Sequence, residues 1–173
     1  KSKSPHSKVH FVSGGTQANL LVISAILRPH ESVVSATTGH IFTNETGAIE
    51  ATGHKVHGVE TKDGKLRPED IQNVLDVHTN VPHQVKQKLV YISNSTEVGT
   101  IYTKKELENL SEFCKKKNLY LFMDGARLGH ALTAKSNDVT WEDVARLTDV
   151  YYLGGTKNGA LIGEAIVINN KNL

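Results

Sequence analysis

The sequence is poor in several residue types whose abundance would point to a particular class of protein. Only one of its 173 residues is a cysteine, which excludes an intrachain disulfide framework and makes a reducing, cytoplasmic setting the simple interpretation. That residue, Cys114, lies on the apolar side of a helical pattern. We therefore predict a buried structural thiol rather than a nucleophile.

Charge of one sign and long apolar runs are also lacking. Lys and Arg number 20 against 18 Asp and Glu, and the only basic cluster is 115–117, so the sequence does not predict a surface for nucleic acid. The apolar run at 20–27 is interrupted by Ser24 and is too short to cross a bilayer. With 38% hydrophobic and 22% charged residues, the composition is that of one globular domain, and we expect neither nucleic acid nor membrane as a partner.

Strand-like and helix-like segments alternate along the chain. Because the strand-like segments are short and continuously apolar, the pattern predicts a three-layer αβα domain with a mostly parallel sheet. The expected strands are 9–12, 32–35, 54–59, 88–92, 119–123, 150–153 and 164–168. The expected helices are 16–27, 44–52, one that begins at Arg67 and Pro68, 104–117 and 141–147.

The same pattern sets the expected domain limits. Residues 1–8 are polar and lack periodicity, so we predict a loop or a ragged edge there, and one large domain over 9–173. The last expected strand is followed by no helix that could cover it. We therefore expect the domain to be incomplete, with a small C-terminal domain missing.

Two glycines and a hydroxyl, Gly14-Gly15-Thr16, stand where an expected strand gives way to a helix. Unpaired backbone N–H groups at a helix start attract anions, so this segment is a candidate phosphate site. The alternative is a simple turn in which Thr16 caps the helix. Neither the dinucleotide-binding fingerprint nor the P-loop pattern is present, which argues against a nucleotide ligand.

Asp124 follows the most apolar of the expected strands, at the end where open α/β sheets bind ligands. A carboxylate in that place needs a cationic partner. One alternative is a structural ion pair with Arg127, and the other is a protonated pyridine nitrogen, to which a charge-assisted hydrogen bond contributes roughly 1.5–3 kcal/mol.

Lys157 lies in a glycine-rich loop after another expected strand, and His40 follows the second strand. By itself Lys157 would be a solvated loop lysine, but the phosphate site, Asp124 and Lys157 are all expected at the same edge of the sheet. His40 could lie flat on a cofactor ring at that edge, or be a hydrogen-bonded loop histidine. His54 and His57 fall in an expected strand with an offset that places them on opposite faces, and we expect no metal.

Four motifs occur in the order seen in one family of enzymes. They are Gly-Gly-Thr-Gln-Ala-Asn at 14–19, Gly-His at 39–40, Asp-Gly-Ala-Arg-Leu-Gly at 124–129 and Gly-Gly-Thr-Lys-Asn-Gly at 154–159. In these motifs the chain resembles the low-specificity threonine aldolases and related β-eliminating lyases, which are pyridoxal 5'-phosphate (PLP) enzymes of fold type I. The similarity extends over about 9–169.

The resemblance implies a phosphate site made by Gly15, Thr16 and Gln17. Thr156 would add a hydroxyl to the same phosphate.

The resemblance also assigns roles around the cofactor ring. His40 would stack on the ring, Asp124 would pair with its nitrogen, and Arg127 would reach the ring hydroxyl or the substrate carboxylate. Lys157 would carry the cofactor as a Schiff base. The implied reaction breaks the Cα–Cβ bond of a β-hydroxy amino acid, giving glycine and acetaldehyde from threonine, in a homodimer or a dimer of dimers.

The sequence departs from the aldolase pattern at Glu97. Aligned on Gly99, this glutamate stands where many threonine aldolases have a second active-site histidine. Glu97 could be the base if burial raised its pKa, or this branch could run transamination or β-elimination on the same cofactor. The predicted catalytic set is therefore Lys157, His40, Asp124 and Glu97, and the alternative from another class is a non-catalytic domain that binds a phosphorylated metabolite.

Overall fold

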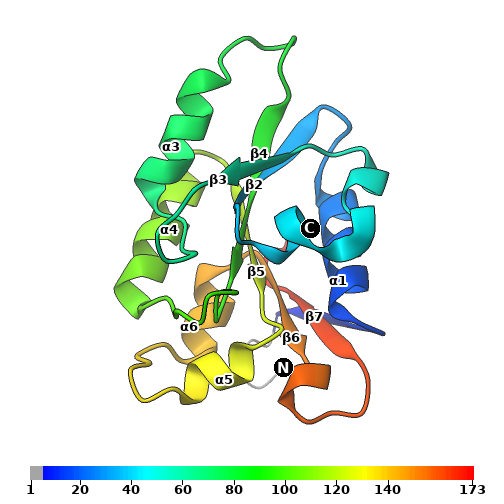
Figure 1. Cartoon of the computed structure of the whole chain (residues 1–173), viewed down its shortest axis with the longest axis vertical. Helices are drawn as coiled ribbons and strands as arrows, with labels where there is room; N and C mark the ends of the chain where they lie inside the picture. The colour runs from blue at the N-terminus through cyan, green and yellow to red at the C-terminus, as the bar shows by residue number, and fades with distance from the viewer. Residues whose placement is uncertain (1–5) are drawn as a thin grey trace.

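A seven-stranded sheet forms the centre of the computed structural model, which describes residues 6–173 (Figure 1). The order across the sheet is β1-β7-β6-β5-β4-β2-β3. The strands are β1 Lys8–Val12, β2 Glu31–Ala36, β3 Val56–Val59, β4 Lys86–Ser93, β5 Tyr120–Asp124, β6 Val150–Gly154 and β7 Glu164–Ile168. The predicted N-terminal loop gives way to β1 at Lys8, and its residues 1–5 lie outside the described part of the chain.

The predicted mostly parallel sheet is confirmed, with one reversal. Strands β2 to β6 are parallel to one another, whereas β7 is antiparallel to both β6 and β1. Because β7 is reversed, β1 runs in the same direction as β6, and the carboxyl ends of β1, β2, β4, β5 and β6 meet at one edge. The last strand, β7, is covered on its outer side by β1, which pairs with it and forms the edge of the sheet.

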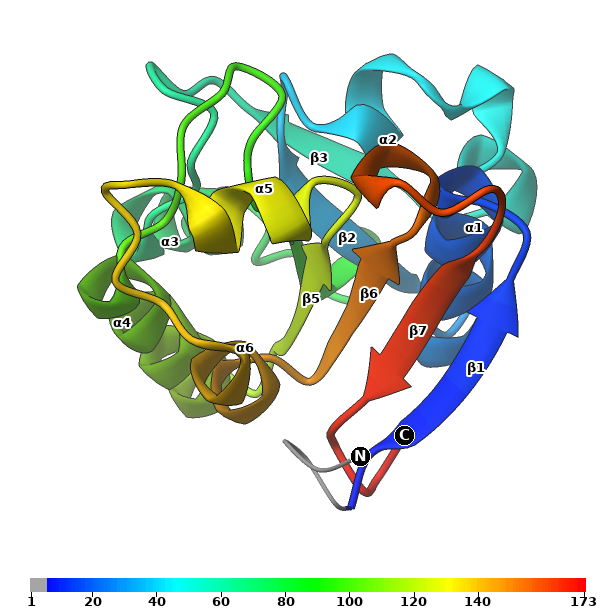
Figure 2. The ribbon, with the colours of Figure 1, turned by 90° about the horizontal axis from the view of Figure 1, so that it is seen from below.

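Helices cover both faces of the sheet, as Figure 2 shows. Helices α3, α4, α5 and α6 pack on one apolar core, and α1 with the segment after β2 packs on a second core on the other face. The helices are α1 Gly15–Ile26, α2 His40–Thr43, α3 Pro68–Val77, α4 Lys104–Lys116, α5 Leu128–Thr133 and α6 Trp141–Leu147. Three short 3₁₀ turns are η1 Glu45–Gly47, η2 Glu50–Thr52 and η3 Thr156–Asn158.

Local capping explains why some helix limits could be predicted closely. The Thr103 hydroxyl accepts from Glu106 N at 3.2 Å and Thr140 accepts from Asp143 N at 3.1 Å, each in a capping box at the start of α4 and α6. Both helices therefore begin where the sequence predicts.

The helix predicted over 44–52 is wrong. The short helix α2 ends before this segment, which instead contains the turns η1 and η2, because Glu45 and Thr46 have φ angles of 71° and 53°. A left-handed conformation at two successive residues interrupts a right-handed helix. Helix α5 was not predicted at all, since its six residues are too few to produce a periodic signal.

The third strand is shorter than predicted, and His54 precedes it. Strand β3 begins at Val56, and Nδ1 of His54 lies 3.1 Å from the carbonyl oxygen of Glu31. In the described part of the chain, no group of three or more His, Cys, Asp or Glu side chains has the arrangement of a metal site. Among residues 6–173, no helix has the length and apolar content that a membrane span requires.

Candidate active site

A cavity of about 210 Å³ opens at the edge where the parallel strands end. Eight of the nine site residues predicted from the sequence line it, and Gln17 does not. The lining residues are Gly15, Thr16, His40, Glu97, Asp124, Ala126, Arg127, Tyr152, Thr156, Lys157 and Glu164.

The first residues of α1 form one wall of this cavity. The N-cap residue of the helix is Gly14, which has no side chain that could accept a hydrogen bond. The amide groups of the first turn therefore have no partner within the helix. A methyl group on Gly15 would lie 2.9 Å from the Tyr152 hydroxyl oxygen, so the close packing of α1 on β6 leaves no room for a side chain there. This wall can accept an anion that approaches the helix start.

Gln17 points away from the cavity. Its Oε1 accepts hydrogen bonds from the backbone N–H and the hydroxyl of Ser13, both at 2.8 Å. The side chain lines a different, more apolar cavity of about 490 Å³ beside β1 and α1. The predicted contact between Gln17 and a phosphate stays a prediction.

Asp124 is the last residue of β5 and is 3% exposed. Its Oδ1 accepts from Ala126 N at 2.9 Å, and its Oδ2 accepts from the Tyr91 hydroxyl at 2.5 Å and from Asn19 Nδ2 at 3.3 Å. Among the ion pairs of the described residues, none joins Asp124 to Arg127. A buried carboxylate that borders a cavity and lacks a protein cation fits a protonated ring nitrogen.

Lys157 lies in the turn η3 directly after β6, and neighbouring side chains fix that turn. The Glu164 carboxylate accepts from Gly155 N at 2.6 Å and from the Thr156 hydroxyl at 2.9 Å. Asn158 Nδ2 donates to the carbonyl oxygens of Gly154 and Ala126, at 2.6 and 3.1 Å. Among the ion pairs of residues 6–173 none involves Lys157, so its amine is available to a ligand in the cavity.

His40 begins α2, and a buried carboxylate holds its ring. His40 Nδ1 lies 2.5 Å from Oε1 of Glu45, whose side chain is fully buried. This hydrogen bond raises the pKa of His40 above its ordinary value, although partial burial acts in the opposite direction. The imidazole is therefore held at the cavity in a fixed orientation.

Glu97 reaches the cavity from the loop after β4. Its Oε1 accepts from the Ser93 hydroxyl at 2.7 Å and from His40 N at 3.2 Å. Burial raises the pKa of Glu97, and the hydrogen bond from Ser93 opposes this shift only in part. A glutamate with a raised pKa is a stronger base than an ordinary one.

Several residues of the site could not be predicted from the sequence. Asn19, Tyr91 and Tyr152 are buried positions of an amphipathic helix and two apolar strands, where sequence reasoning finds only core residues. Glu45 fell inside the wrongly predicted helix. Glu164 gave one usable signal, since it is the single charge at the start of an otherwise apolar strand.

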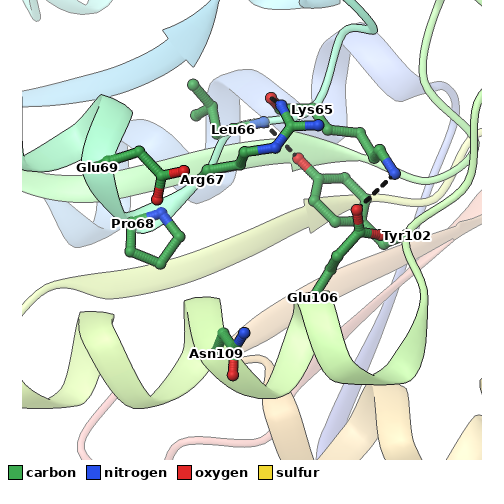
Figure 3. Close-up of a pocket in the computed structure, with 8 residues that line it drawn as sticks. All are labelled: Lys65, Leu66, Arg67, Pro68, Glu69, Tyr102, Glu106 and Asn109. Atoms are coloured by element: carbon green, nitrogen blue, oxygen red, sulfur yellow. Dashed lines mark hydrogen bonds and ion pairs between the residues drawn. The ribbon is translucent and has the colours of Figure 1, made fainter.

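A further cavity, of about 220 Å³, lies between the start of α3 and α4 (Figure 3). Its two cations already have partners, because Lys65 Nζ lies 2.7 Å from Glu106 and Arg67 lies 2.7 Å from Asp63. The Tyr102 hydroxyl accepts a hydrogen bond from Leu66 N at 2.8 Å. This cavity therefore offers no unpaired cation to an anionic cofactor.

Comparison with known proteins agrees with the geometry of the site. The model of the β-eliminating lyase family matches residues 5–173. The chain belongs to the β-eliminating lyase family. Enzymes of this family depend on PLP, and the resemblance predicted from the four motifs is confirmed.

Individual relatives of this β-eliminating lyase chain include threonine aldolases and a racemase. It is 37% identical to a low-specificity L-threonine aldolase of Pseudomonas aeruginosa over 96% of this chain and 48% of that protein. It is 57% identical to a solved threonine aldolase of Leishmania major, with a TM-score of 0.94 over 96% of this chain and 48% of the other. It is also 29% identical to alanine racemase TOXG of Cochliobolus carbonum, over 94% of this chain and 42% of the other.

The chain spans about half the length of the relatives it matches. The agreement in fold with the Leishmania enzyme nevertheless extends over nearly all of its residues, and the predicted fold type I architecture is confirmed.

Proposed function

We propose that this chain is the cofactor-binding part of a PLP-dependent lyase that cleaves the Cα–Cβ bond of a β-hydroxy amino acid. With threonine the products would be glycine and acetaldehyde. One observation carries the proposal: the buried Asp124 carboxylate, which has no ion-pair partner among the described residues, and the Lys157 amine line the same cavity as a helix start. The names of the Pseudomonas and Leishmania relatives support the choice of reaction.

The residues of the cavity fit PLP in their chemistry. When bound, PLP supplies an electron-accepting ring that weakens bonds at the α-carbon of an amino acid. Asp124 would hold a proton on the ring nitrogen, and the first turn of α1 would bind the phosphate. Lys157 would carry the cofactor covalently, and His40 would lie against the ring.

Arg127 and Glu97 are the residues that would act on the substrate. Arg127 is half-buried, and no ion pair of the described residues involves it, so its guanidinium can take a carboxylate or the ring hydroxyl. Glu97, with its raised pKa, would accept the proton of the substrate hydroxyl and so assist cleavage.

The decisive experiment uses the full-length protein with added PLP and sodium borohydride, followed by peptide mass spectrometry. We expect the reduced cofactor on the peptide that contains Lys157. Lys157→Ala should abolish this labelling, whereas Lys135→Ala, which changes an exposed lysine, should not. Unchanged labelling in Lys157→Ala would show that the site is wrongly assigned.

Product analysis separates the proposed reaction from its nearest alternatives on the same cofactor. Glycine and acetaldehyde from threonine would support carbon–carbon cleavage. A 2-oxo acid or released ammonia would support transamination or β-elimination, which the glutamate at position 97 keeps open.

The wider setting also belongs to the proposal. We propose that residues 9–173 are the large, PLP-binding domain and that the protein is a cytoplasmic homodimer or dimer of dimers. The described residues contain no candidate membrane span, which is compatible with this setting.

A further inference from the structure

A buried polar network lies behind the cavity and connects four separate segments of the chain. It runs from His40 at the start of α2 to Glu45 in η1, then to Asn19 in α1 and to Asp124 at the end of β5. Asn19 is fully buried, and Glu45 and Asp124 are 5% and 3% exposed. Buried polar groups in such numbers cost stability unless hydrogen bonds or opposite charges compensate them.

The backbone at Glu45 supports a functional purpose. Glu45 and Thr46 are two of the three non-glycine residues with positive φ in the described chain. Conformations of this kind are unfavourable for residues with a side chain and cluster at active sites. Here the unusual backbone turns the Glu45 side chain inward, toward His40 and Asn19.

Asn19 separates two carboxylates that would otherwise repel each other. Its Nδ2 donates to Glu45 Oε1 at 2.8 Å and to Asp124 Oδ2 at 3.3 Å. One amide group thus fixes the distance between the carboxylate that binds the imidazole and the one proposed to bind the ring nitrogen. Neither carboxylate can shift without breaking a hydrogen bond in the interior.

We propose that Glu45 is a positioning residue that keeps a proton on Nδ1 of His40, so that a cationic imidazole with a free Nε2–H borders the cavity, and that Asn19 holds Glu45 in place. The pairing of Glu45 with His40 is independent of the cofactor. Its effect on a bound ligand rests on the proposed function.

The charged groups around His40 act in both directions. Glu45 from η1 and Asp124 from β5 favour the protonated ring, whereas Lys157 from η3 opposes it. Glu97 contacts the same residue through the backbone N–H. Burial alone would raise the pKa of Glu45, but hydrogen bonds with His40, Thr16 and Asn19 outweigh it and lower that pKa. Both directions favour a carboxylate paired with an imidazolium.

A titration of His40 by ¹⁵N NMR in the full-length protein, labelled at histidine and free of PLP, tests the pairing. We expect His40 in Glu45→Gln to release its proton at lower pH than in the wild type, because the neutral amide keeps the shape and loses the charge. Glu50→Gln removes an exposed glutamate five residues away and should leave the titration unchanged. An unchanged His40 titration in Glu45→Gln would overturn the proposal.

A second measurement does not depend on the variant folding. In the wild type, the ¹⁵N shifts should show both ring nitrogens of His40 still protonated at pH 6.5, the ordinary midpoint for histidine. A neutral ring with an unprotonated Nδ1 at that pH would equally overturn the proposal.

Equilibrium dialysis with PLP distinguishes failure of this inference from failure of the proposed function. We expect the Kd for PLP to rise roughly 3- to 10-fold in Glu45→Gln, because the variant loses about the contribution of one hydrogen bond that orients His40. Equal Kd values in wild type and variant would contradict the role of Glu45 while leaving the function intact. Absence of PLP binding in the wild type, with the His40 titration shifted as expected, would contradict the function and leave the pairing intact.

Discussion

At the scale of single residues, the site is notable for carboxylates that are buried without an adjacent Lys or Arg. Asp124, Glu45 and Glu164 are 3–5% exposed, and hydrogen bonds from hydroxyl, amide, imidazole and backbone N–H groups hold them. Burying a charge in this way is unfavourable unless a cation or several donors compensate it. For Asp124 we expect that cation to come from the cofactor.

Asp124→Asn tests this expectation directly. The amide cannot act as a charged partner for a protonated ring nitrogen, so the loss of a charge-assisted bond worth roughly 1.5–3 kcal/mol should weaken PLP binding about 10- to 100-fold. Equilibrium dialysis measures the effect. Asp76→Asn, which changes an exposed aspartate of α3, is the matched control, and equal weakening in both variants would exclude a specific role for Asp124.

At the scale of elements, glycines allow the loops that carry Asp124 and Lys157 to cross closely. A methyl group on Gly125 would lie 1.9 Å from the carbonyl oxygen of Tyr152, and one on Gly154 would lie 2.5 Å from that of Ala126. These contacts are with backbone atoms that no side-chain rotation can relieve. The loops after β5 and β6 therefore depend on each other for their conformation.

Gly125→Ala should consequently destabilise the protein. We expect a loss of roughly 1–3 kcal/mol in the free energy of unfolding, measured with urea, together with weaker PLP binding because Asp124 is displaced. Gly14→Ala is the comparison, since a methyl group there meets no atom within 4 Å, and its cost should stay below about 1 kcal/mol. Similar values for the two variants would contradict the packing argument.

A buried histidine, His57, lies in β3 at the edge of the sheet opposite β1. His57 Nε2 in β3 lies 3.1 Å from the Ser32 hydroxyl oxygen in β2 and 3.2 Å from Gln87 Nε2 in β4, and the ring packs edge-on against His78 at 4.4 Å between centroids. Burial, together with the nearby His78 and Lys55, lowers the pKa of His57 to about 4.

This histidine should make folding stability depend on pH. Below pH 6.5, the ordinary pKa of histidine, His57 binds a proton in the unfolded chain but stays neutral in the folded chain. The free energy of unfolding therefore decreases as the pH falls from 6.5 to about 4. Urea unfolding at pH 7 and at pH 4 gives the difference in the free energy of unfolding between the two pH values. This difference should be smaller in His57→Leu than in the wild type by roughly 1–3 kcal/mol. His10→Gln, at an exposed position of β1, should keep the dependence of the wild type.

At the scale of the whole molecule, the site draws residues from both ends of the described chain. Gly15 and Glu164 line the same cavity because the reversal of β7 brings β1 next to the last strand. A ligand in that cavity would contact α1, α2 and the loops after β4, β5 and β6 together. Binding should therefore stabilise the fold as one unit.

Thermal and urea unfolding of the full-length protein measure this linkage. At a PLP concentration of 100 times its Kd, we expect the free energy of unfolding to rise by about 2.7 kcal/mol. Pyridoxal, which lacks the phosphate, should give a smaller rise if the start of α1 holds that group. Equal stabilisation by both compounds would argue against the phosphate site at Gly15 and Thr16.

The sequence by itself determined the fold class, the family and most of the residues that line the cavity. Alternating apolar strands and helices predict a layered domain because burial follows periodicity, and capping boxes fix where α4 and α6 begin. Motif residues such as Asp124 and Lys157 could be assigned to one edge because parallel strands all end on the same side of a sheet.

Only the tertiary structure decided how those residues are supported. The contacts of Asn19 with two carboxylates and of Tyr91 with Asp124 depend on atoms brought together from distant segments. A linear pattern records which residues repeat on one face, and it carries no information about which buried donor meets which acceptor. For that reason most of the predicted residues line the cavity, whereas missed residues such as Asn19 and Tyr91 are hydrogen-bonded behind it.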